Sequence, residues 1–293
     1  MQNDCQIFRG VEGKNIFYLH IPKTAGSAIN KLFVSGYGDD KALTHIESKD
    51  LFGKKESKKE VSGYKYLSGH IPYPRVQLNI DLCRWASICT FRRPEEQLAS
   101  HFSWVRLLAE PGHEDRLGQH TASIRKIVSY MKDVDLSSPD QIAGLIEWLE
   151  GNKFYLFHNA QTRYLCGGNA GRGIEPKLLH MALDNLDAID FVGIVERMDE
   201  FILMLAHVFQ LGVDESSLAK ENSNSERFGL DLSNKETRKV VEPLIAYDRI
   251  ICAKAREKFI DQYHSFLAVL EKNKQLSYTT VNINSLKKAI IHT

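Results

Sequence analysis

The sequence predicts an α/β protein in which helices cover both faces of a mostly parallel central sheet. Short apolar runs rich in β-branched and aromatic residues alternate with helical patterns along the chain. Such runs are typical of parallel strands that are buried on both faces. A chain of 293 residues is long enough for this three-layer sandwich, and we expect one domain over residues 1–293.

Each predicted element follows from a local pattern. Four apolar runs predict strands at residues 16–21, 64–71, 86–91 and 188–195. Four helical patterns predict helices at residues 95–108, 140–150, 197–210 and 236–271. Pro94 suits a first helical position, whereas Pro243 should lie near the start or a kink of the last helix. We expect a loop-rich, substrate-side insertion at residues 110–175 and a C-terminal extension at residues 273–293.

The bulk properties exclude several classes of function. A formal net charge of +1 gives no reason to expect a nucleic-acid partner, and the basic run at 53–60 also contains glutamates, as solvated loops do. We expect no membrane span and no signal peptide, because no apolar stretch approaches about 18 residues and the N-terminus lacks a basic–apolar pattern. The five cysteines form no CxxC pair, which favours free thiols in the cytoplasm over a zinc site.

Residues 22–28 (PKTAGSA) suit an anion, because a helix that begins just after Pro22 would expose unpaired backbone N–H groups there. Lys23 adds a positive charge, and Gly26 lacks the Cβ that would block close approach. The nucleotide-binding pattern GxxxxGK[ST] is absent from the chain, since here the lysine precedes the glycine. The alternative interpretation is a capped helix with an exposed lysine. The proposed phosphate contacts are the backbone N–H groups of Thr24, Ala25, Gly26, Ser27 and Ala28, together with the hydroxyls of Thr24 and Ser27.

Residues 20–30 (HIPKTAGSAIN) resemble the 5′-phosphosulfate loop of sulfotransferases, in the branch of the heparan-sulfate 2-O-sulfotransferases and their bacterial relatives. The chain departs from that pattern at Ala28, where a hydroxyl residue is common. Residues 89–106 (CTFRRPEEQLASHFSWVR) resemble the family's 3′-phosphate motif, with Arg92 at a strand end and Ser100 eight residues later. An arginine at a strand end offers a fork of donors to a phosphate.

Two further segments support this resemblance. Residues 184–201 resemble a family segment in which the strand FVG leads through Glu-Arg into a helix, and we interpret it as scaffold. Residues 220–228 (KENSNSERF) resemble a polar loop that closes over the nucleotide in relatives, although a surface loop is an equal alternative. Its candidate contacts are Asn222, Ser225 and Arg227.

The resemblance implies a P-loop-like fold and a sulfotransferase that uses 3′-phosphoadenosine 5′-phosphosulfate (PAPS) as donor, with PAP as product and no required metal. Lys23 would bind the 5′-phosphate and the bridging oxygen, whereas Arg92 and Ser100 would hold the 3′-phosphate. By analogy with phosphoryl transfer, catalysis would then consist mainly of positioning and charge stabilisation.

His70 is our first candidate for the base that removes the acceptor's proton. It follows a glycine at a strand end, where the 2-O-sulfotransferase relatives carry a catalytic histidine, and an imidazole accepts a proton near neutral pH. The alternative bases are His45 and Glu47, whereas we expect His20 and His101 to be structural. Aromatic candidates for an acceptor pocket are Tyr73, Phe102 and Trp104, although core packing is the default interpretation of Phe102.

The acceptor is expected to be a saccharide or small-molecule hydroxyl, less readily an amine. Near-neutral charge argues against a wholly basic cleft, although a local basic groove could use Arg75, Arg84, Arg106, Arg163 and Arg172. Two other functions stay open: a small-molecule kinase, disfavoured by the missing GxxxxGK[ST], and a non-catalytic nucleotide-binding protein. The sequence leaves the oligomeric state undecided.

Overall fold

The computed structural model describes residues 10–11, 13–49, 61, 63–167, 175–212 and 230–276. The basic run at 53–60, most of the expected C-terminal extension and the candidate contacts Asn222, Ser225 and Arg227 lie outside these residues.

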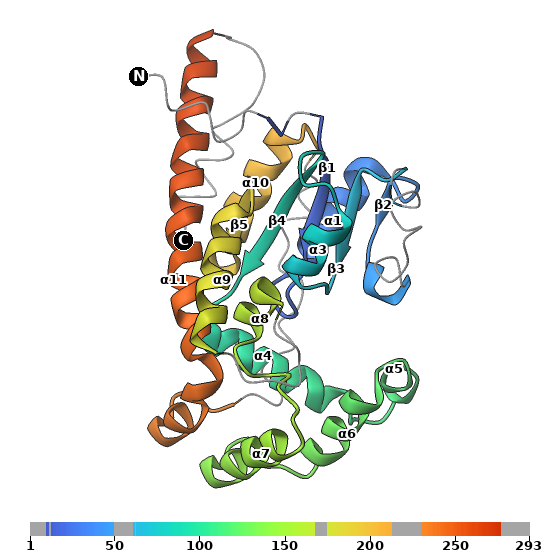
Figure 1. The fold of residues 1–293 in the computed structure, drawn as a ribbon, viewed down its shortest axis with the longest axis vertical. Helices are drawn as coiled ribbons and strands as arrows, with labels where there is room; N and C mark the ends of the chain where they lie inside the picture. Colours follow the sequence, from blue (N-terminus) through green and yellow to red (C-terminus); the bar gives the residue numbers. More distant parts are fainter. Residues whose placement is uncertain are drawn as a thin grey trace.

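The described residues form a parallel sheet with helices on both faces (Figure 1). The strands are β1 (Asn15–Leu19), β2 (Ala42–Leu43), β3 (Tyr66–Gly69), β4 (Trp85–Phe91) and β5 (Phe191–Ile194). The helices are α1 (Gly26–Tyr37), α3 (Tyr73–Asn79), α4 (Pro94–Leu107), α5 (Glu114–Gly118), α6 (Ala122–Met131), α7 (Pro139–Gly151), α8 (Ala160–Cys166), α9 (Pro176–Ala188), α10 (Met198–Val208) and α11 (Lys235–Leu276), with 3-10 turns η1 (Ile46–Lys49) and η2 (Val195–Arg197).

The sheet has the strand order β2-β3-β1-β4-β5, and each neighbouring pair is parallel. Side chains of β1 alternate between two cores, because successive residues of a strand point to opposite faces. Phe17 and Leu19 pack with residues of α3, α8 and α9, whereas Ile16 and Tyr18 pack with residues of α1 and α10. This is the three-layer α/β sandwich that the apolar runs predict.

The predicted strands and helices are present, with differences where the sequence signal is short. The two-residue strand β2 lies below the length at which a pattern can be recognised. The expectation that the segment 110–175 is loop-rich is wrong, because its described part contains α5 to α8. Two of these helices have N-caps that were not predicted from the sequence. The hydroxyl of Thr121 caps α6 by accepting from the N–H of Ile124 at 3.4 Å. The hydroxyl of Ser138 caps α7 by accepting from the N–H of Gln141 at 3.4 Å.

Helices α4, α6 and α7 and the first turns of α11 share a hydrophobic cluster of their own, which we call the helical lobe. It lies beyond the carboxyl edge of the sheet (Figure 1). Pro243 lies inside α11 rather than at its start. Asn159 compensates there: its side-chain N–H donates to Pro243 O (3.2 Å), its backbone N–H to Leu244 O (2.6 Å), and its Oδ1 accepts from the N–H of Tyr247 (2.7 Å).

No helix in the described part of the chain has both the length and the apolar character needed to cross a membrane. The described cysteines, Cys83, Cys89, Cys166 and Cys252, are free thiols.

Candidate functional site

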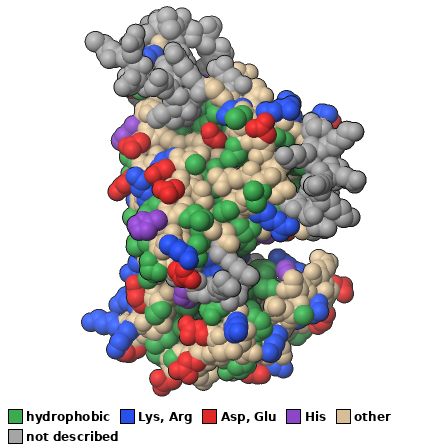
Figure 2. Space-filling model, viewed as in Figure 1, with side chains coloured by type: hydrophobic (Ala, Val, Ile, Leu, Met, Phe, Trp, Pro, Cys, Tyr) green, Lys and Arg blue, Asp and Glu red, His purple; other side chains and the backbone are tan. Residues whose placement is uncertain are grey.

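The sequence-predicted site residues gather at one edge of the sheet because all strands run in the same direction. Lys23 follows β1, His70 follows β3 and Arg92 follows β4, each just beyond the carboxyl end of its strand. Ligands of open α/β sheets bind at this edge. Figure 2 shows the surface hollowed there, between the sheet layer and the helical lobe, with basic and histidine side chains at the mouth of the hollow.

The loop between β1 and α1 has a backbone shape that suits an anion. Lys23 (φ 69°) and Ala25 (φ 60°) both adopt the left-handed conformation, which is uncommon for residues other than glycine. Alternation of left- and right-handed residues turns successive N–H groups towards one point and forms an anion-binding nest. The helix begins at Gly26, so the expectation of a start just after Pro22 is wrong. The N–H of Ala28 donates to Ala25 O at 3.2 Å, so the predicted phosphate contact of Ala28 is already engaged. The N–H groups of Gly26 and Ser27 precede the first turn and have no carbonyl partner within the helix, and Ser27 is exposed.

Buried hydroxyls hold this loop in place. Thr24 is fully buried, and its hydroxyl donates to the carbonyl of Ile21 at 2.8 Å. The hydroxyl of Thr90 on β4 donates in turn to the carbonyl of Thr24 at 2.8 Å and accepts from Tyr18 at 2.5 Å. The expected hydroxyl contact of Thr24 with phosphate is therefore replaced by a structural one, and its backbone N–H is the group left for an anion. Gln97 of α4, which the sequence did not single out, donates to Pro22 O at 3.1 Å.

Gly26 is required by the ring of His20 rather than by a ligand. A Cβ at position 26 would overlap that ring. His20 stacks on Tyr18, with ring centroids 5.4 Å apart, and its buried Nδ1 has no hydrogen-bond partner among the described residues. Burial, with His70, His45 and Lys23 as further causes, lowers the pKa of His20 to about 2 and keeps the ring neutral. The sequence predicts a close approach at Gly26, but the approaching group is a side chain of the loop itself.

Arg92 and Arg116 lie close enough to Lys23 for their positive charges to act on its ammonium group. Burial lowers the pKa of the Lys23 ammonium, and Arg92 and Arg116 lower it further. Arg116 belongs to α5, so the segment expected on the substrate side brings a cation to the loop. Mutual repulsion of this kind is relieved when an anion binds among the cations.

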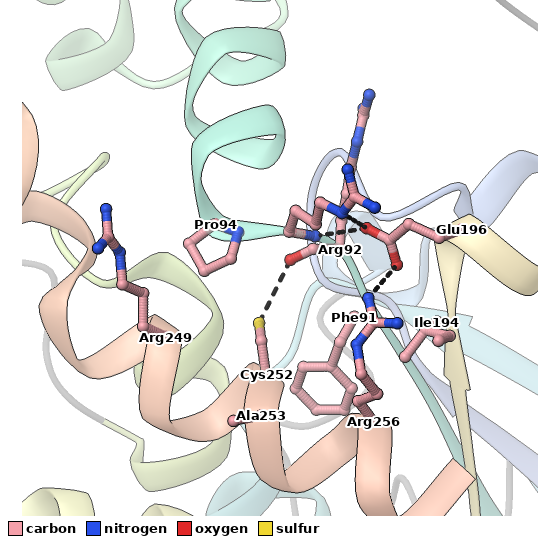
Figure 3. A pocket seen from close by; sticks show the side chains of 10 residues that line it. Phe91, Arg92, Pro94, Ile194, Glu196, Arg249, Cys252, Ala253 and Arg256 are labelled. Carbon is pink, nitrogen blue, oxygen red and sulfur yellow. Dashed lines mark hydrogen bonds and ion pairs between the residues drawn. The ribbon is translucent and has the colours of Figure 1, made fainter. Parts of the chain in front are cut away.

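The backbone at Arg92 is held by three hydrogen bonds, two with Gln161 and one with Cys252. The N–H of Arg92 donates to Oε1 of Gln161 at 3.0 Å, and the Arg92 carbonyl accepts from Nε2 of Gln161 at 2.9 Å and from the thiol of Cys252 at 3.3 Å. The next N–H, that of Arg93, donates to Glu196 at 2.9 Å. Figure 3 shows the contacts of Cys252 and Glu196 around a pocket between β4, β5 and α11. Glu196 also pairs with Arg256 at 3.7 Å, in agreement with the scaffold role expected for its segment.

The Arg92 side chain is 24% exposed and bonds through Nε to Glu96 at 3.4 Å, which leaves terminal N–H donors of the guanidinium for a ligand. Ser100 lies on the same stripe of α4 as Gln97, one turn further from the loop contact, and is 7% exposed. Arg92 thus follows β4, Ser100 lies in α4, and both elements contact the loop between β1 and α1.

His70 has its proton placed by a backbone carbonyl. Its Nδ1 donates to His20 O at 2.6 Å, which leaves the lone pair on Nε2. Its ring lies 4.2 Å from that of His20, and Tyr164 of α8 approaches it edge-on at 6.4 Å. Burial lowers the pKa of His70, although Glu47 and the bond to His20 act in the opposite direction. A neutral imidazole with an unshared Nε2 pair is the form that acts as a general base.

Glu47 contacts His70 through the backbone. Its Oε2 accepts from the His70 N–H at 3.0 Å, and its Oε1 lies 3.4 Å from Nδ1 of His45. Gly69 makes this possible, because a Cβ there would lie 2.6 Å from Oε2 of Glu47. The two alternative bases thus lie beside His70 instead of apart from it. The contact joins residues 23 positions apart, so no local pattern could predict it.

Several expected acceptor-side residues are used elsewhere. Tyr73 and Phe102 are fully buried in the core, so only Trp104 of the aromatic candidates reaches the surface. Arg84 precedes β4 and so lies at the opposite edge of the sheet. Arg106 donates to the carbonyl of Met131 and Arg163 to that of His158, each at 2.7 Å. Arg172 lies outside the described residues, and Arg75 lies in α3.

His101 follows Ser100 on α4 and is 2% exposed, and its buried Nδ1 has no hydrogen-bond partner in the part of the chain that the structure describes. Its ring packs edge-on against Phe157 at 5.0 Å. Burial, with Lys23 and His70 as further causes, lowers its pKa to about 3. The sequence-based expectation of a structural histidine agrees with this packing.

This burial makes the stability of the protein depend on pH. Below about pH 6.5 the unfolded chain protonates His101, whereas the folded protein does so only near pH 3, so stability falls as pH falls through this window. One such group costs about 2 kcal/mol between pH 7 and pH 5. We expect His101→Phe to remove that loss, measured as the difference between urea unfolding curves of the two proteins at each pH. Equal pH slopes for both proteins would contradict the buried neutral state.

We compared the chain with protein-family models and with curated proteins, and no family model and no curated protein matches it. The geometry at the carboxyl edge of the sheet is therefore the basis for a function.

Proposed function

We propose that the protein is a sulfotransferase that moves a sulfuryl group from PAPS to a hydroxyl of a saccharide or small-molecule acceptor. The observation that carries the proposal is the position of His70: its Nε2 lone pair is oriented by the bond to His20 O, next to a left-handed loop that bears Lys23. A base beside an anion-binding loop suits transfer from an anionic donor to a neutral hydroxyl.

In this proposal the loop N–H groups from Thr24 to Ser27 bind the 5′-phosphate, because that of Ala28 donates to Ala25 O. Lys23 offsets the negative charge that develops on the bridging oxygen as the sulfur–oxygen bond breaks. Arg92 and Ser100 hold the 3′-phosphate, which is the group that distinguishes this donor from ATP. These residues act by positioning and by charge stabilisation, with their donors fixed before the reaction.

His70 accepts the proton of the attacking hydroxyl on Nε2 while Nδ1–H keeps its bond to His20 O. The resulting imidazolium is stabilised by Glu47, whose carboxylate lies against the His70 backbone at 3.0 Å. The free thiols of the described cysteines support a reducing compartment, and we place the reaction in the cytoplasm.

Binding of adenosine 3′,5′-bisphosphate, measured by calorimetry without added metal, tests the donor site. We expect the wild type to prefer the bisphosphate over ATP with Mg²⁺. Arg92→Ala should weaken bisphosphate binding roughly 10- to 100-fold, because a bond from a charged group to phosphate contributes about 1.5–3 kcal/mol. Arg84→Ala is the matched control, since Arg84 lies at the other end of the same strand, and should leave the affinity unchanged.

Two results would contradict the proposal. Binding of ATP with Mg²⁺ but not of the bisphosphate would favour the kinase alternative. Equal bisphosphate affinities of wild type and Arg92→Ala would remove the assigned 3′-phosphate contact. A non-catalytic nucleotide-binding protein would bind the bisphosphate but show no transfer that depends on His70.

A further inference from the structure

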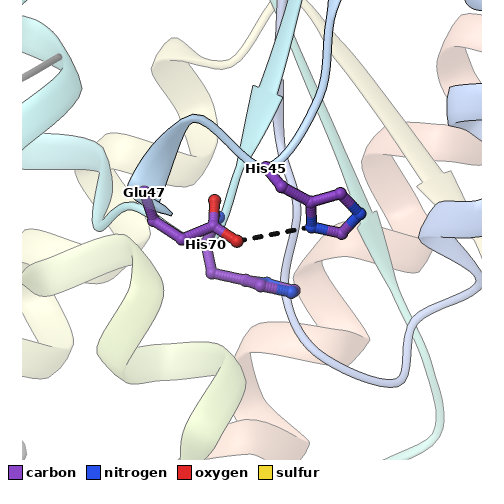
Figure 4. A group of neighbouring side chains, drawn as sticks. All are labelled: His45, Glu47 and His70. Atoms are coloured by element: carbon purple, nitrogen blue, oxygen red, sulfur yellow. Dashed lines mark hydrogen bonds and ion pairs between the residues drawn. The ribbon is translucent and has the colours of Figure 1, made fainter. Parts of the chain in front are cut away.

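Three side chains with metal-binding atoms converge at the ends of β2 and β3. His45, Glu47 and His70 each offer one nitrogen or oxygen, and these atoms lie within 4.8 Å of one another. Figure 4 shows the Glu47 carboxylate and the His45 ring beside the ring of His70. We propose that these three residues bind a divalent cation of the zinc type, in competition with the use of His70 as a base.

The donor set favours zinc over the hard cations. Two imidazoles and one carboxylate are a known three-ligand set for zinc, with a fourth position open to water, whereas magnesium and calcium prefer sites built of oxygens. Ligand atoms about 2.0–2.2 Å from a tetrahedral zinc ion lie roughly 3.3–3.6 Å apart. Nδ1 of His45 and Oε1 of Glu47 already lie 3.4 Å apart. Closure therefore needs a shift of little more than an ångström, and His45 is exposed on a connection after a short strand.

The surroundings orient the ligands as they do in metal sites. A ligating histidine usually donates its other N–H to a carbonyl or carboxylate, and Nδ1 of His70 donates to His20 O at 2.6 Å. Nε2 of His70 is thus the atom directed to a cation. Glu47 is held through Oε2 by the His70 N–H at 3.0 Å, which leaves Oε1 as the ligand.

His45 provides an independent observation. Its backbone is in the left-handed region (φ 55°), an unfavourable conformation for a residue with a Cβ. Backbone strain of this kind persists where the surrounding structure fixes it, and it is concentrated at functional sites. Here it directs the imidazole of His45 towards Glu47.

The consequence for catalysis rests on the proposed function. A cation bound to Nε2 of His70 occupies the lone pair that would accept the acceptor's proton, so the metal-bound protein lacks its base. The bound cation is therefore an inhibitor of transfer and has no part in the reaction.

Calorimetric titration of the metal-free, full-length protein with zinc chloride tests the site directly. We expect one equivalent to bind, and we expect His45→Ala and Glu47→Gln each to weaken binding at least as much as loss of an outer-shell partner does, which is roughly 10- to 100-fold. His180→Ala is the matched control, because His180 is exposed on α9 away from the cluster, and it should bind zinc as the wild type does. Zinc should also inhibit transfer by the wild type and by His180→Ala at the same concentrations, with reversal by a chelator. Half-inhibition of His45→Ala, measured against that variant's own activity without zinc, should need at least about tenfold more zinc.

Absence of a stoichiometric zinc site, or equal affinities of His45→Ala and His180→Ala, would overturn the inference. The two proposals fail separately. Zinc binding without bisphosphate binding would retain the metal site and refute the sulfotransferase, and the reverse result would refute only the metal site.

Discussion

Replacement of His70 by alanine is expected to lower the rate of sulfuryl transfer by roughly 10²- to 10⁴-fold, which is the usual contribution of a positioned general base. Binding of adenosine 3′,5′-bisphosphate should stay close to that of the wild type, because the proposed phosphate contacts come from the loop after β1 and from Arg92. The measurements are single-turnover transfer and calorimetric binding on the same preparation.

His70→Asn separates the base from its structural bond. An asparagine amide can donate to His20 O in place of the Nδ1–H, which donates at 2.6 Å in the wild type, but it has no basic nitrogen. We therefore expect His70→Asn to retain the thermal stability of the wild type and to be as inactive as His70→Ala. If His70→Asn kept most of the activity, the role of His70 would be structural and another group would be the base.

Gly26→Ala is expected to disrupt the anion-binding loop. The added Cβ would overlap the ring of His20, which is itself packed between Tyr18 and His70. Overpacking at such a position typically costs about 1–3 kcal/mol, and the shift of the loop should abolish measurable bisphosphate binding. Differential scanning calorimetry and ligand titration report the two effects independently.

Ala25→Gly is the matched control for this prediction, because it should relieve strain in the same loop instead of adding it. Ala25 is left-handed (φ 60°), so glycine relieves strain while it adds backbone freedom to the unfolded chain. We expect the melting temperature of Ala25→Gly to stay near or above that of the wild type, with bisphosphate binding retained. Wild-type stability and binding in Gly26→Ala would show that His20 can move away, and would contradict the packing described above.

The sheet could be predicted from the sequence because its strands are apolar throughout and alternate with helical patterns. The site could be placed because parallel strands bring their carboxyl ends to one edge, so Lys23, His70 and Arg92 had to lie near one another. Local signals of this kind do not extend to side-chain contacts. The ring of His20 covers Gly26, and Thr24 turns its hydroxyl into the loop, because of packing that only the folded chain defines.

The supporting residues had no signal that could have identified them. Gln97 and Gln161 are ordinary polar residues of helical segments, yet Gln97 holds the loop between β1 and α1 and Gln161 holds the backbone at Arg92. Asn159 bonds to α11 beside Pro243, 84 positions further along the chain. Each contact depends on how α4, α8 and α11 pack together. Polar groups that serve buried backbone are recognised only when that backbone's neighbours are known.

Helix α11 gives the hollow beside the site a mechanical property. It runs over 42 residues, or about 63 Å, and contributes to both cores of the sheet and to the helical lobe. The lobe and the sheet thus pack against one continuous helix. The turn at Pro243 is the easiest part of this helix to bend, because proline lacks the N–H for a helix hydrogen bond. If the proposed function holds, widening the hollow would require α11 to bend, and an oversized acceptor would then enter only at an elastic cost. Selection of the acceptor by size would depend on the stiffness of a helix that is remote from the proposed base.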